Sequence, residues 1–446
     1  MNEHTPLHDL LTFLRFPSVS TEPRNADDVR SCAGWLANKL AAMGLHARVI
    51  PTDGHPIVLA KSEVKPELKT ILIYGHYDVQ PVDPLDQWEH PPFEPRVKDG
   101  IITARGATDN KGQILSHVLG VQETLQKEGE LPVNVIFLIE GEEEIGSPNL
   151  TPFLKEYQDE LKCDVVVISD TGMIAPGIPT FTYGLRGVSC LEFTVKGPSH
   201  DLHSGIFGGT IANPAAVISK MIASLHDENG KVAIEGFYDE VKAPEEWERE
   251  GWKKLPVHES EFQELTDVPE LYGEKGYSGF ERTWIRPTAE VNGLYSGYQG
   301  EGSKTIVPST ATAKLSFRLV PDQDCLKILE LAEAHLKKHC PPSVTLEIER
   351  QHSGNAYLVD PQSGFGKAAT EAAKEAFPGA DPALIREGGS IPIVAEFKNI
   401  LGVDTLLFGL ALPDARCHSP NENFPVANFE GGMRLNQCML KHLAAV

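Results

Sequence analysis

The segment VNVIFLIEGEEEIGS, residues 133–147, joins an apolar run to a cluster of glutamates. Residues 133–139 predict a buried strand, because a short run rich in Val and Ile fits the interior of a parallel sheet. The glutamates that follow are Glu140, Glu142, Glu143 and Glu144. A solvated loop would explain them. A charge run is usually of that kind; the alternative is a cation held opposite, because crowded carboxylates repel one another until a counter-ion compensates them.

Other apolar runs of the same kind extend the pattern along the chain. They are TILIYG (70–75), DVVVIS (164–169) and VDTLLFGL (403–410). Helical patterns at 27–44 and 111–129 separate or precede these runs, and Gly44 stands where the first helix should end. Strands that alternate with helices predict an α/β fold with a mostly parallel sheet flanked by helices.

The pattern changes after residue 185. Half-buried strands are expected at 186–197 and 309–321, and amphipathic helices at 213–226 and 324–339, which together favour an α+β layer with an antiparallel sheet. Residues 228–300 show little periodicity and are expected to be irregular. Because the α/β pattern returns near the C-terminus, we predict one domain formed by residues 1–185 and 381–446, with residues 186–380 inserted as a second domain.

Charge and cysteine content narrow the function. The net charge of −23 argues against nucleic acid or an anionic membrane as a partner, since both require a basic face. The seven cysteines are scattered, odd in number and without a C-x-x-C pair, which fits a reducing compartment. The N-terminal MNEHTPLHDLLTFLRF lacks the features of a signal peptide, and no apolar run is long enough to span a membrane. We therefore expect a soluble cytoplasmic protein.

Polar residues follow each apolar strand of the first domain. They are His76 and Asp78 after 70–75, the glutamates after 133–139, Asp170 after 164–169 and, through a loop, His418 after 403–410, and Asp109 follows RGAT. Open parallel sheets gather ligands outside the carboxyl ends of their strands, so these residues can converge. Imidazoles mixed with carboxylates suit Zn²⁺ or Mn²⁺ better than Ca²⁺ or a structural zinc site. The carboxylates exceed what one ion needs, which favours two ions that share a bridging carboxylate.

Seven segments, in order and over essentially the whole chain, resemble the dinuclear metallopeptidases that include carnosinase-type dipeptidases, aminoacylases and glutamate carboxypeptidases. The segments are GHYDVQPVD (75–83), GATDNKG (106–112), EGEEEIGS (140–147), ISD (168–170), DLHSG (201–205), REGGSIP (386–392) and CHSPNE (417–422). GHYDVQPVD, REGGSIP and the long insertion at 228–300 place the resemblance nearest the carnosinase-like dipeptidase branch. It implies a zinc-peptidase-like catalytic domain with an inserted lid and dimerisation domain.

The resemblance also implies a ligand set for two divalent metal ions, Zn²⁺ or Mn²⁺. His76 and Asp170 would bind one ion, Glu144 and His418 the other, and Asp109 would bridge them. Read singly, a histidine after a strand is more often a structural hydrogen-bonder, and an aspartate there is commonly a helix cap.

Two neighbouring carboxylates receive catalytic roles from the same resemblance. Asp78 would orient the His76 imidazole, and Glu143 would be the general base that takes a proton from the metal-bridging water and delivers it to the leaving amine. The peptide between Asp109 and Asn110 is cis in this family, whereas the default for such a bond is trans.

The inserted domain supplies the remaining residues that the resemblance singles out. His203 would reach the active site of the partner subunit of a homodimer and stabilise the oxyanion, and Arg318 would hold the substrate carboxylate. Thr305 and Ser390 match further substrate-binding positions. From the sequence pattern alone, His203 is more simply a surface histidine of the inserted domain, and Arg318 could equally be a solvated charge in an alternating strand.

These residues predict a metal-dependent hydrolase that cleaves the amide bond of dipeptides or short peptides with a free terminal carboxylate. An N-acyl-amino-acid amidohydrolase needs the same metals and the same carboxylate grip, so it is the first alternative. A catalytically inactive metal-binding scaffold of the same fold would have lost a ligand or the base, and all of these positions are present. An unrelated α/β protein with acidic strand ends would bind no stoichiometric metal.

Overall fold

The apolar runs become neighbouring strands of one nine-stranded sheet in the computed structural model, which describes residues 5–446. Its strands, in spatial order, are β1 (His46–Ile50), β2 (Ile57–Lys61), β6 (Asn134–Glu140), β3 (Thr70–His76), β7 (Val165–Ile168), β17 (Thr405–Gly409), β8 (Thr180–Leu185) and β15 (Tyr357–Leu358), and β16 (Ala383–Glu387) also pairs with β8. Strands β6, β3, β7 and β17 run parallel, as do β8 and β16. The mostly parallel core confirms the predicted α/β fold. The residues MNEH, which begin the segment in which we expect no signal peptide, lie outside the described residues.

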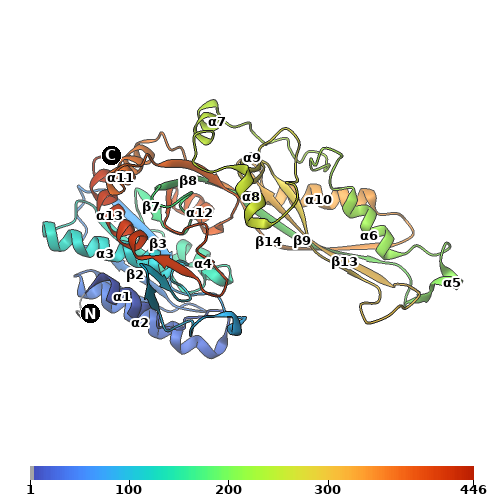
Figure 1. Cartoon of the computed structure of the whole chain (residues 1–446), viewed down its shortest axis with the longest axis horizontal. Coiled ribbons are helices and arrows are strands. Elements are labelled where there is room, and N and C mark those ends of the chain that lie inside the picture. Colours follow the sequence, from blue (N-terminus) through green and yellow to red (C-terminus); the bar gives the residue numbers. More distant parts are fainter. Residues whose placement is uncertain (1–4) are drawn as a thin grey trace.

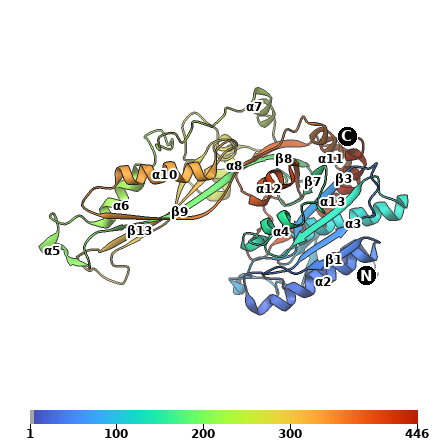
Figure 2. The same ribbon diagram turned by 180° about the vertical axis from the view of Figure 1, so that it is seen from behind.

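Helices cover both faces of this sheet. They are α1 (Pro6–Phe13), α2 (Ala26–Ala42), α3 (Lys111–Glu128), α4 (Leu150–Glu156), α11 (Gly364–Ala376), α12 (Pro392–Glu396) and α13 (Val426–Leu443). Helix α13 packs against α3 and α11 in front of the sheet in Figure 1, whereas α4 and α12 lie in front of it in the reverse view of Figure 2. The expected helices at 27–44 and 111–129 are present, and Gly44 and Gly129 follow them with φ of 90° and 79°, which glycine adopts without strain.

A second lobe is built on an antiparallel sheet of four strands, as the sequence predicts. Its order is β11 (Thr288–Ser296), β13 (Thr310–Leu319), β9 (Gly187–Lys196) and β14 (Thr345–Gly354). Helices α6 (Pro214–Ala223) and α10 (Cys325–His339) pack on this sheet and enclose a separate apolar core with residues such as Phe193 and Phe317. At the far end of the lobe, β10 (Leu202–His203) pairs with β12 (Ile306–Val307) beside α5 (Ser204–Phe207) (Figure 1).

The expectation that residues 228–300 are irregular is wrong in part. The segment contains α7 (Glu246–Trp252), α8 (Glu259–Thr266), α9 (Gly279–Trp284) and the nine-residue strand β11. Strand β11 lies at the edge of its sheet and most of its residues are exposed, so its sequence lacks the apolar alternation that reveals a half-buried strand. The helices are short, and too few turns are present for a helical period to be visible.

The domain boundaries at 185/186 and 380/381 remain predictions. The first falls between β8 and β9, where the chain passes from one sheet to the other. Near the second, β15 already pairs with β8, and α11 packs on α13. We therefore propose that the chain returns to the first domain near residue 355, before the predicted boundary.

None of the seven cysteines forms a disulfide. Within residues 5–446, no helix combines the length and the apolar character needed to cross a membrane.

Candidate metal centre and active site

The carboxyl ends of the parallel strands gather the polar residues that the sequence singles out. His76 is the last residue of β3, Asp170 follows β7 by two residues, and Asp109 lies in the loop that precedes α3. His418 comes from the loop after β17, and Glu144 from the turn after β6. Five segments that are distant in sequence therefore meet at one edge of the sheet, as expected for a ligand site in an open α/β sheet.

Asp109 lies between the two histidines. Its Oδ1 is 3.2 Å from Nε2 of His76, and its Oδ2 is 2.8 Å from Nε2 of His418. The same His76 nitrogen is 3.8 Å from Oδ2 of Asp170, and the His418 nitrogen is 3.4 Å from Oε2 of Glu144. Each imidazole thus faces one carboxylate of its own and shares Asp109, which is the arrangement that two bridged cations require.

The donor set fits metal ions. One atom each from His76, Asp109 and Glu144 lies within 4.8 Å of the others. Nε2 of His76 is completely buried, yet it makes no hydrogen bond of good geometry within residues 5–446. A buried polar atom without a partner is costly, so this nitrogen is poised to ligate a cation.

The electrostatics of the cluster point the same way. Burial raises the pKa of Glu143 to about 7 and that of Glu144 to about 8, with further contributions from neighbouring carboxylates. Burial opposes a charged His76, but the facing carboxylates outweigh it and raise the pKa of this imidazole well above its usual value. A hydrogen bond to Asp109 raises the pKa of His418 to about 9. The facing carboxylates thus hold protons on both imidazoles, and the pKa values of Glu143 and Glu144 are still raised, so the cluster attracts more positive charge than its own residues supply. Bound cations would supply it.

The chain turns sharply at Glu143 and Glu144, directly after β6. Residues Glu143–Ile145 form one turn of 3₁₀ helix that ends at Gly146 with φ of 86°. The carboxylate of Asp78 holds this turn: Oδ1 accepts the Glu143 N–H at 3.2 Å, and Oδ2 accepts the Glu144 N–H at 3.1 Å. Oδ1 of Asp78 also lies 3.3 Å from Nδ1 of His76. One carboxylate therefore positions both the imidazole and the glutamate turn.

The other two glutamates of the cluster have structural partners. Glu140 accepts hydrogen bonds from the Tyr74 hydroxyl and the Ser147 hydroxyl. Glu142 accepts from the His55 N–H and from the Asn149 side-chain amide. Neither is directed at the metal-ligand cluster by these contacts.

Glu422 was not identified from the sequence, although it ends the CHSPNE motif. It is completely buried, and its two carboxylate oxygens accept four hydrogen bonds. The donors are the Arg105 guanidinium and the backbone N–H groups of Gly106, Thr108 and Asp109. The Asp109–Asn110 peptide is cis, and the Asn110 side chain donates to Oδ1 of Asp170 at 2.7 Å. Glu422 thus fixes the loop that carries Asp109. This role depends on contacts between distant segments, which the sequence does not show.

Replacing Glu422 with Gln is expected to lower the free energy of unfolding by roughly 3–5 kcal/mol, the usual cost of breaking a buried ion pair. The reason is that the new amide group would face hydrogen-bond donors on every side. Urea unfolding of the purified variant measures the loss. The control is Glu430→Gln on the exposed face of α13, which should change stability by less than about 0.5 kcal/mol. Equal stability of both variants would contradict this role.

Arg318 and Ser390 meet at the junction of the two lobes. Arg318 lies on β13, and its Nη1 donates to the Ser390 hydroxyl at 2.8 Å. In the described chain Arg318 makes no ion pair with a carboxylate, so its guanidinium remains able to bind one. The contact brings together two of the predicted substrate-binding residues.

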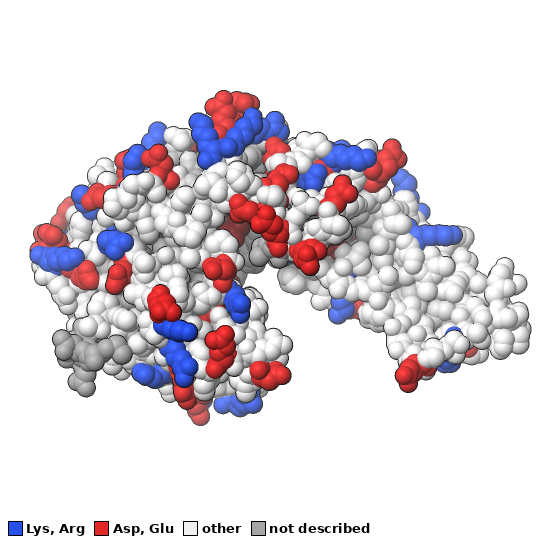
Figure 3. All heavy atoms as spheres, viewed as in Figure 1, with Lys and Arg blue, Asp and Glu red and all other residues white. Residues whose placement is uncertain are grey.

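His203 and Thr305 lie together, but not with the other candidates. The Ser204 N–H donates to the Thr305 carbonyl at 3.0 Å, and both segments form the far tip of the second lobe. Figures 1 and 2 show this tip at the end of the molecule opposite the nine-stranded sheet, and Figure 3 shows a notch between the two lobes. Both residues are exposed. Within one chain, neither is brought to the metal-ligand cluster.

The chain is similar to known peptidases over most of its length. Residues 72–442 match the model of peptidase family M20/M25/M40. A Cys-Gly metallodipeptidase of Saccharomyces cerevisiae is 33% identical, over 96% of this chain and 93% of its own. A Beta-Ala-His dipeptidase of Homo sapiens is 31% identical, over 90% of this chain and 80% of its own. The crystal structure of an M20-family metallo-carboxypeptidase of Sulfolobus solfataricus superimposes with a TM-score of 0.87 at 34% identity, over 99% of this chain and all of its own.

Proposed function

The chain belongs to peptidase family M20/M25/M40, and we propose that it is a metal-dependent dipeptidase that hydrolyses dipeptides with a free terminal carboxylate. The observation that carries the proposal is the cluster of His76, Asp109 and Glu144 beside the buried carboxylate of Glu143. Relatives that cover 90% or more of the chain are named as a metallodipeptidase and a dipeptidase, which agrees with this chemistry.

Two divalent cations would be held by His76, Asp109, Glu144, Asp170 and His418, with Asp109 shared between them. When bound, such ions polarise the scissile carbonyl and make water more acidic. We propose Zn²⁺ or Mn²⁺, because two imidazoles and several carboxylates suit either ion and availability decides between them. The bound ions would also stabilise the ionised carboxylates that burial otherwise disfavours.

Glu143 is the proposed general base and acid. Asp78 accepts hydrogen bonds from the backbone N–H groups of Glu143 and Glu144, which holds the turn that carries both side chains. The raised pKa of Glu143, about 7, matches a group that accepts a proton from water and returns it to the leaving amine near neutral pH.

Arg318 and Ser390 are the proposed grip on the substrate's terminal carboxylate. A planar guanidinium can bind a carboxylate through two parallel hydrogen bonds, and the Ser390 hydroxyl already lies beside it. Thr305 is proposed as a further contact to the substrate and His203 as the oxyanion donor, both supplied by the second subunit of a homodimer. Their place at the tip of the second lobe supports this reading, because it leaves them free to reach another chain.

We place the protein in the cytoplasm on the strength of its seven unpaired cysteines, which persist in a reducing compartment. Two other activities remain candidates. An N-acyl-amino-acid amidohydrolase would use the same cluster and the same carboxylate grip. A carboxypeptidase acting on longer chains is favoured by the similarity to the metallo-carboxypeptidase of Sulfolobus solfataricus.

A substrate panel tests the proposal. We expect the metal-loaded enzyme to hydrolyse leucyl-glycine and other free dipeptides with a higher kcat/KM than N-acetyl-leucine, N-succinyl-leucine or a tripeptide. Dialysis against a chelator should abolish activity, and elemental analysis of the untreated protein should find divalent metal in stoichiometric amount. Activity on the acyl compounds alone would contradict the dipeptidase, and a protein without stoichiometric metal would contradict the metal centre.

A further inference from the structure

A cavity of about 640 Å³ adjoins the metal-ligand cluster and is not used by any residue assigned above to base catalysis or carboxylate binding. Asp109 and Asp170 form part of its wall, so it opens directly onto the place where the scissile bond would lie. Residues 171–174 and 411–413, which follow β7 and β17, form another part. The cavity therefore continues the active site on the side of the carboxyl ends of the strands.

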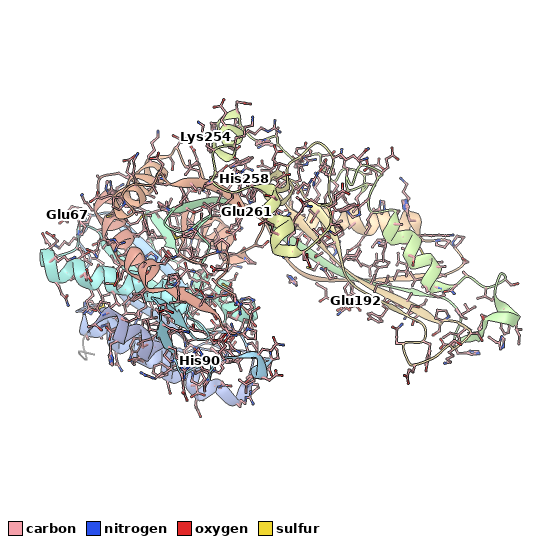
Figure 4. All side chains as sticks on the ribbon, viewed as in Figure 1. Glu67, His90, Glu192, Lys254, His258 and Glu261 are labelled. Atoms are coloured by element: carbon pink, nitrogen blue, oxygen red, sulfur yellow. The ribbon has the colours of Figure 1, made fainter. Side chains whose placement is uncertain are left out.

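The far wall of this cavity is aromatic and comes from the segment that the sequence left without a function. Phe262 of α8 and Phe280 and Trp284 of α9 line it. The Phe262 and Phe280 rings are 5.0 Å apart between centroids, and those of Phe280 and Trp284 are 4.9 Å apart. In Figure 4, His258, which caps α8, and Glu261 of α8 mark the same segment at the junction of the two lobes. The wall offers an apolar surface for a side chain of the substrate.

Glu387 stands in the same cavity as an uncompensated carboxylate. It ends β16, and among residues 5–446 its completely buried Oε2 has no hydrogen-bond partner. The preceding Arg386 cannot neutralise it, because the Arg386 guanidinium binds Glu248 at 2.6 Å. Burial and the nearby Asp170 raise the pKa of Glu387 to about 7, which shows that the surrounding chain disfavours its negative charge. A cationic group of a ligand would satisfy it.

The loop that follows Glu387 is held rigidly. The Arg186 N–H donates to the carbonyls of Glu387 and Gly389, and Nε of Arg186 donates to the Gly388 carbonyl at 3.1 Å. A Cβ on Gly388 would lie 2.9 Å from Arg186 Nη2 and 3.1 Å from the Thr283 carbonyl oxygen, so the glycine allows Arg186 and Thr283 to pack closely on this loop. Ser390 is three residues beyond Glu387, and three residues span at most about 10 Å. One fixed loop thus carries the Glu387 carboxylate at one end and the proposed carboxylate-binding Ser390 at the other. The distance that the loop can span is comparable to the length of a dipeptide.

We propose that Glu387 binds the free α-ammonium group of the substrate's N-terminal residue and that the aromatic wall receives the side chain of that residue. The inference rests on the proposed dipeptidase function, and it names the substrate class as dipeptides with a free amine and a large apolar N-terminal side chain. An N-acyl amino acid or an internal peptide segment has no cation to present to Glu387. Binding such a substrate would leave the carboxylate buried without a partner, which is costly.

The test compares leucyl-glycine with 4-methylpentanoyl-glycine, which differs from it only by lacking the α-amine. The wild-type enzyme is expected to prefer leucyl-glycine by about 30-fold in kcat/KM, the usual worth of a hydrogen bond to a charged group. In Glu387→Gln, kcat/KM for leucyl-glycine should fall by about the same factor while the value for the acyl compound changes little. Glycyl-glycine should be a poorer substrate than leucyl-glycine, and Phe262→Ala should reduce that difference.

A matched control and a binding readout complete the experiment. Glu261→Gln removes a charge from the same cavity, but Oε1 of Glu261 already accepts the His258 N–H at 2.9 Å, so the preference for the amine should persist. Isothermal titration of leucyl-glycine into Glu143→Gln and into Glu143→Gln/Glu387→Gln should show weaker binding to the double variant.

The outcomes separate the two proposals. If the wild type cleaves leucyl-glycine but Glu387→Gln keeps the wild-type preference, the role of Glu387 is overturned and the dipeptidase stands. If the wild type hydrolyses leucyl-glycine and 4-methylpentanoyl-glycine with equal kcat/KM, the inference fails. This outcome does not depend on whether any variant folds. If the wild type cleaves only the acyl compound, or neither, the proposed function itself has failed.

Discussion

Replacing Glu143 with Gln is expected to lower kcat for a dipeptide by roughly 10²–10⁴-fold, the usual contribution of a general acid or base, while the metal content stays at the wild-type level. The glutamine keeps the size and the backbone contact with Asp78 but cannot accept a proton from water. Steady-state kinetics measure the first quantity, and elemental analysis of the dialysed protein measures the second. The combination identifies a group that moves protons without holding the ions.

Glu142→Gln is the control for this experiment, because it removes a carboxylate from the same turn. Glu142 accepts hydrogen bonds from the His55 N–H and the Asn149 amide, so its loss should reduce stability rather than turnover. A Glu143→Gln variant that keeps its metal and still turns over would show that the proton is handled elsewhere. A variant that loses its metal would instead make Glu143 a ligand.

The sequence predicted the larger sheet well because its strands are buried on both faces. Runs such as 133–139 and 70–75 are almost continuously apolar and buried, and polar residues follow each of them at the carboxyl ends of the strands. The convergence of His76, Asp109 and His418 followed from this topology. Their roles as ligands remain predictions.

What escaped prediction depends on contacts between distant segments. Strand β11 is exposed on a sheet edge, and β8 is a six-residue strand interrupted by Gly184, so neither carries a strong local period. Glu422 acts by accepting four hydrogen bonds from residues more than 300 positions away in sequence. Glu387 is notable because its buried Oε2 accepts no hydrogen bond from the described residues 5–446. No local pattern encodes such a partner or the absence of one.

His203 is exposed at the tip of the second lobe, away from the cluster of His76, Asp109 and Glu144 in its own chain. If this residue completes the active site of another subunit, His203→Ala should lower kcat by about 10²–10³-fold, as the loss of an oxyanion donor does, with KM and metal content little changed. The reason is that the tip of the second lobe carries His203 away from the cluster of its own chain (Figure 1). An unaltered kcat in this variant would contradict any catalytic role.

Complementation then decides whether His203 acts within its chain or across the dimer. A heterodimer of Glu143→Gln and His203→Ala contains one site with an intact Glu143 and the partner's intact histidine, and one site that lacks both. In a twofold dimer it should therefore recover about half of the wild-type activity, although each parent is nearly inactive. Co-expression with two different tags and sequential purification isolates this heterodimer. A heterodimer as inactive as its parents, or a monomer with full activity, would show that the histidine does not cross between subunits, because only action in trans restores an intact site from two defective chains.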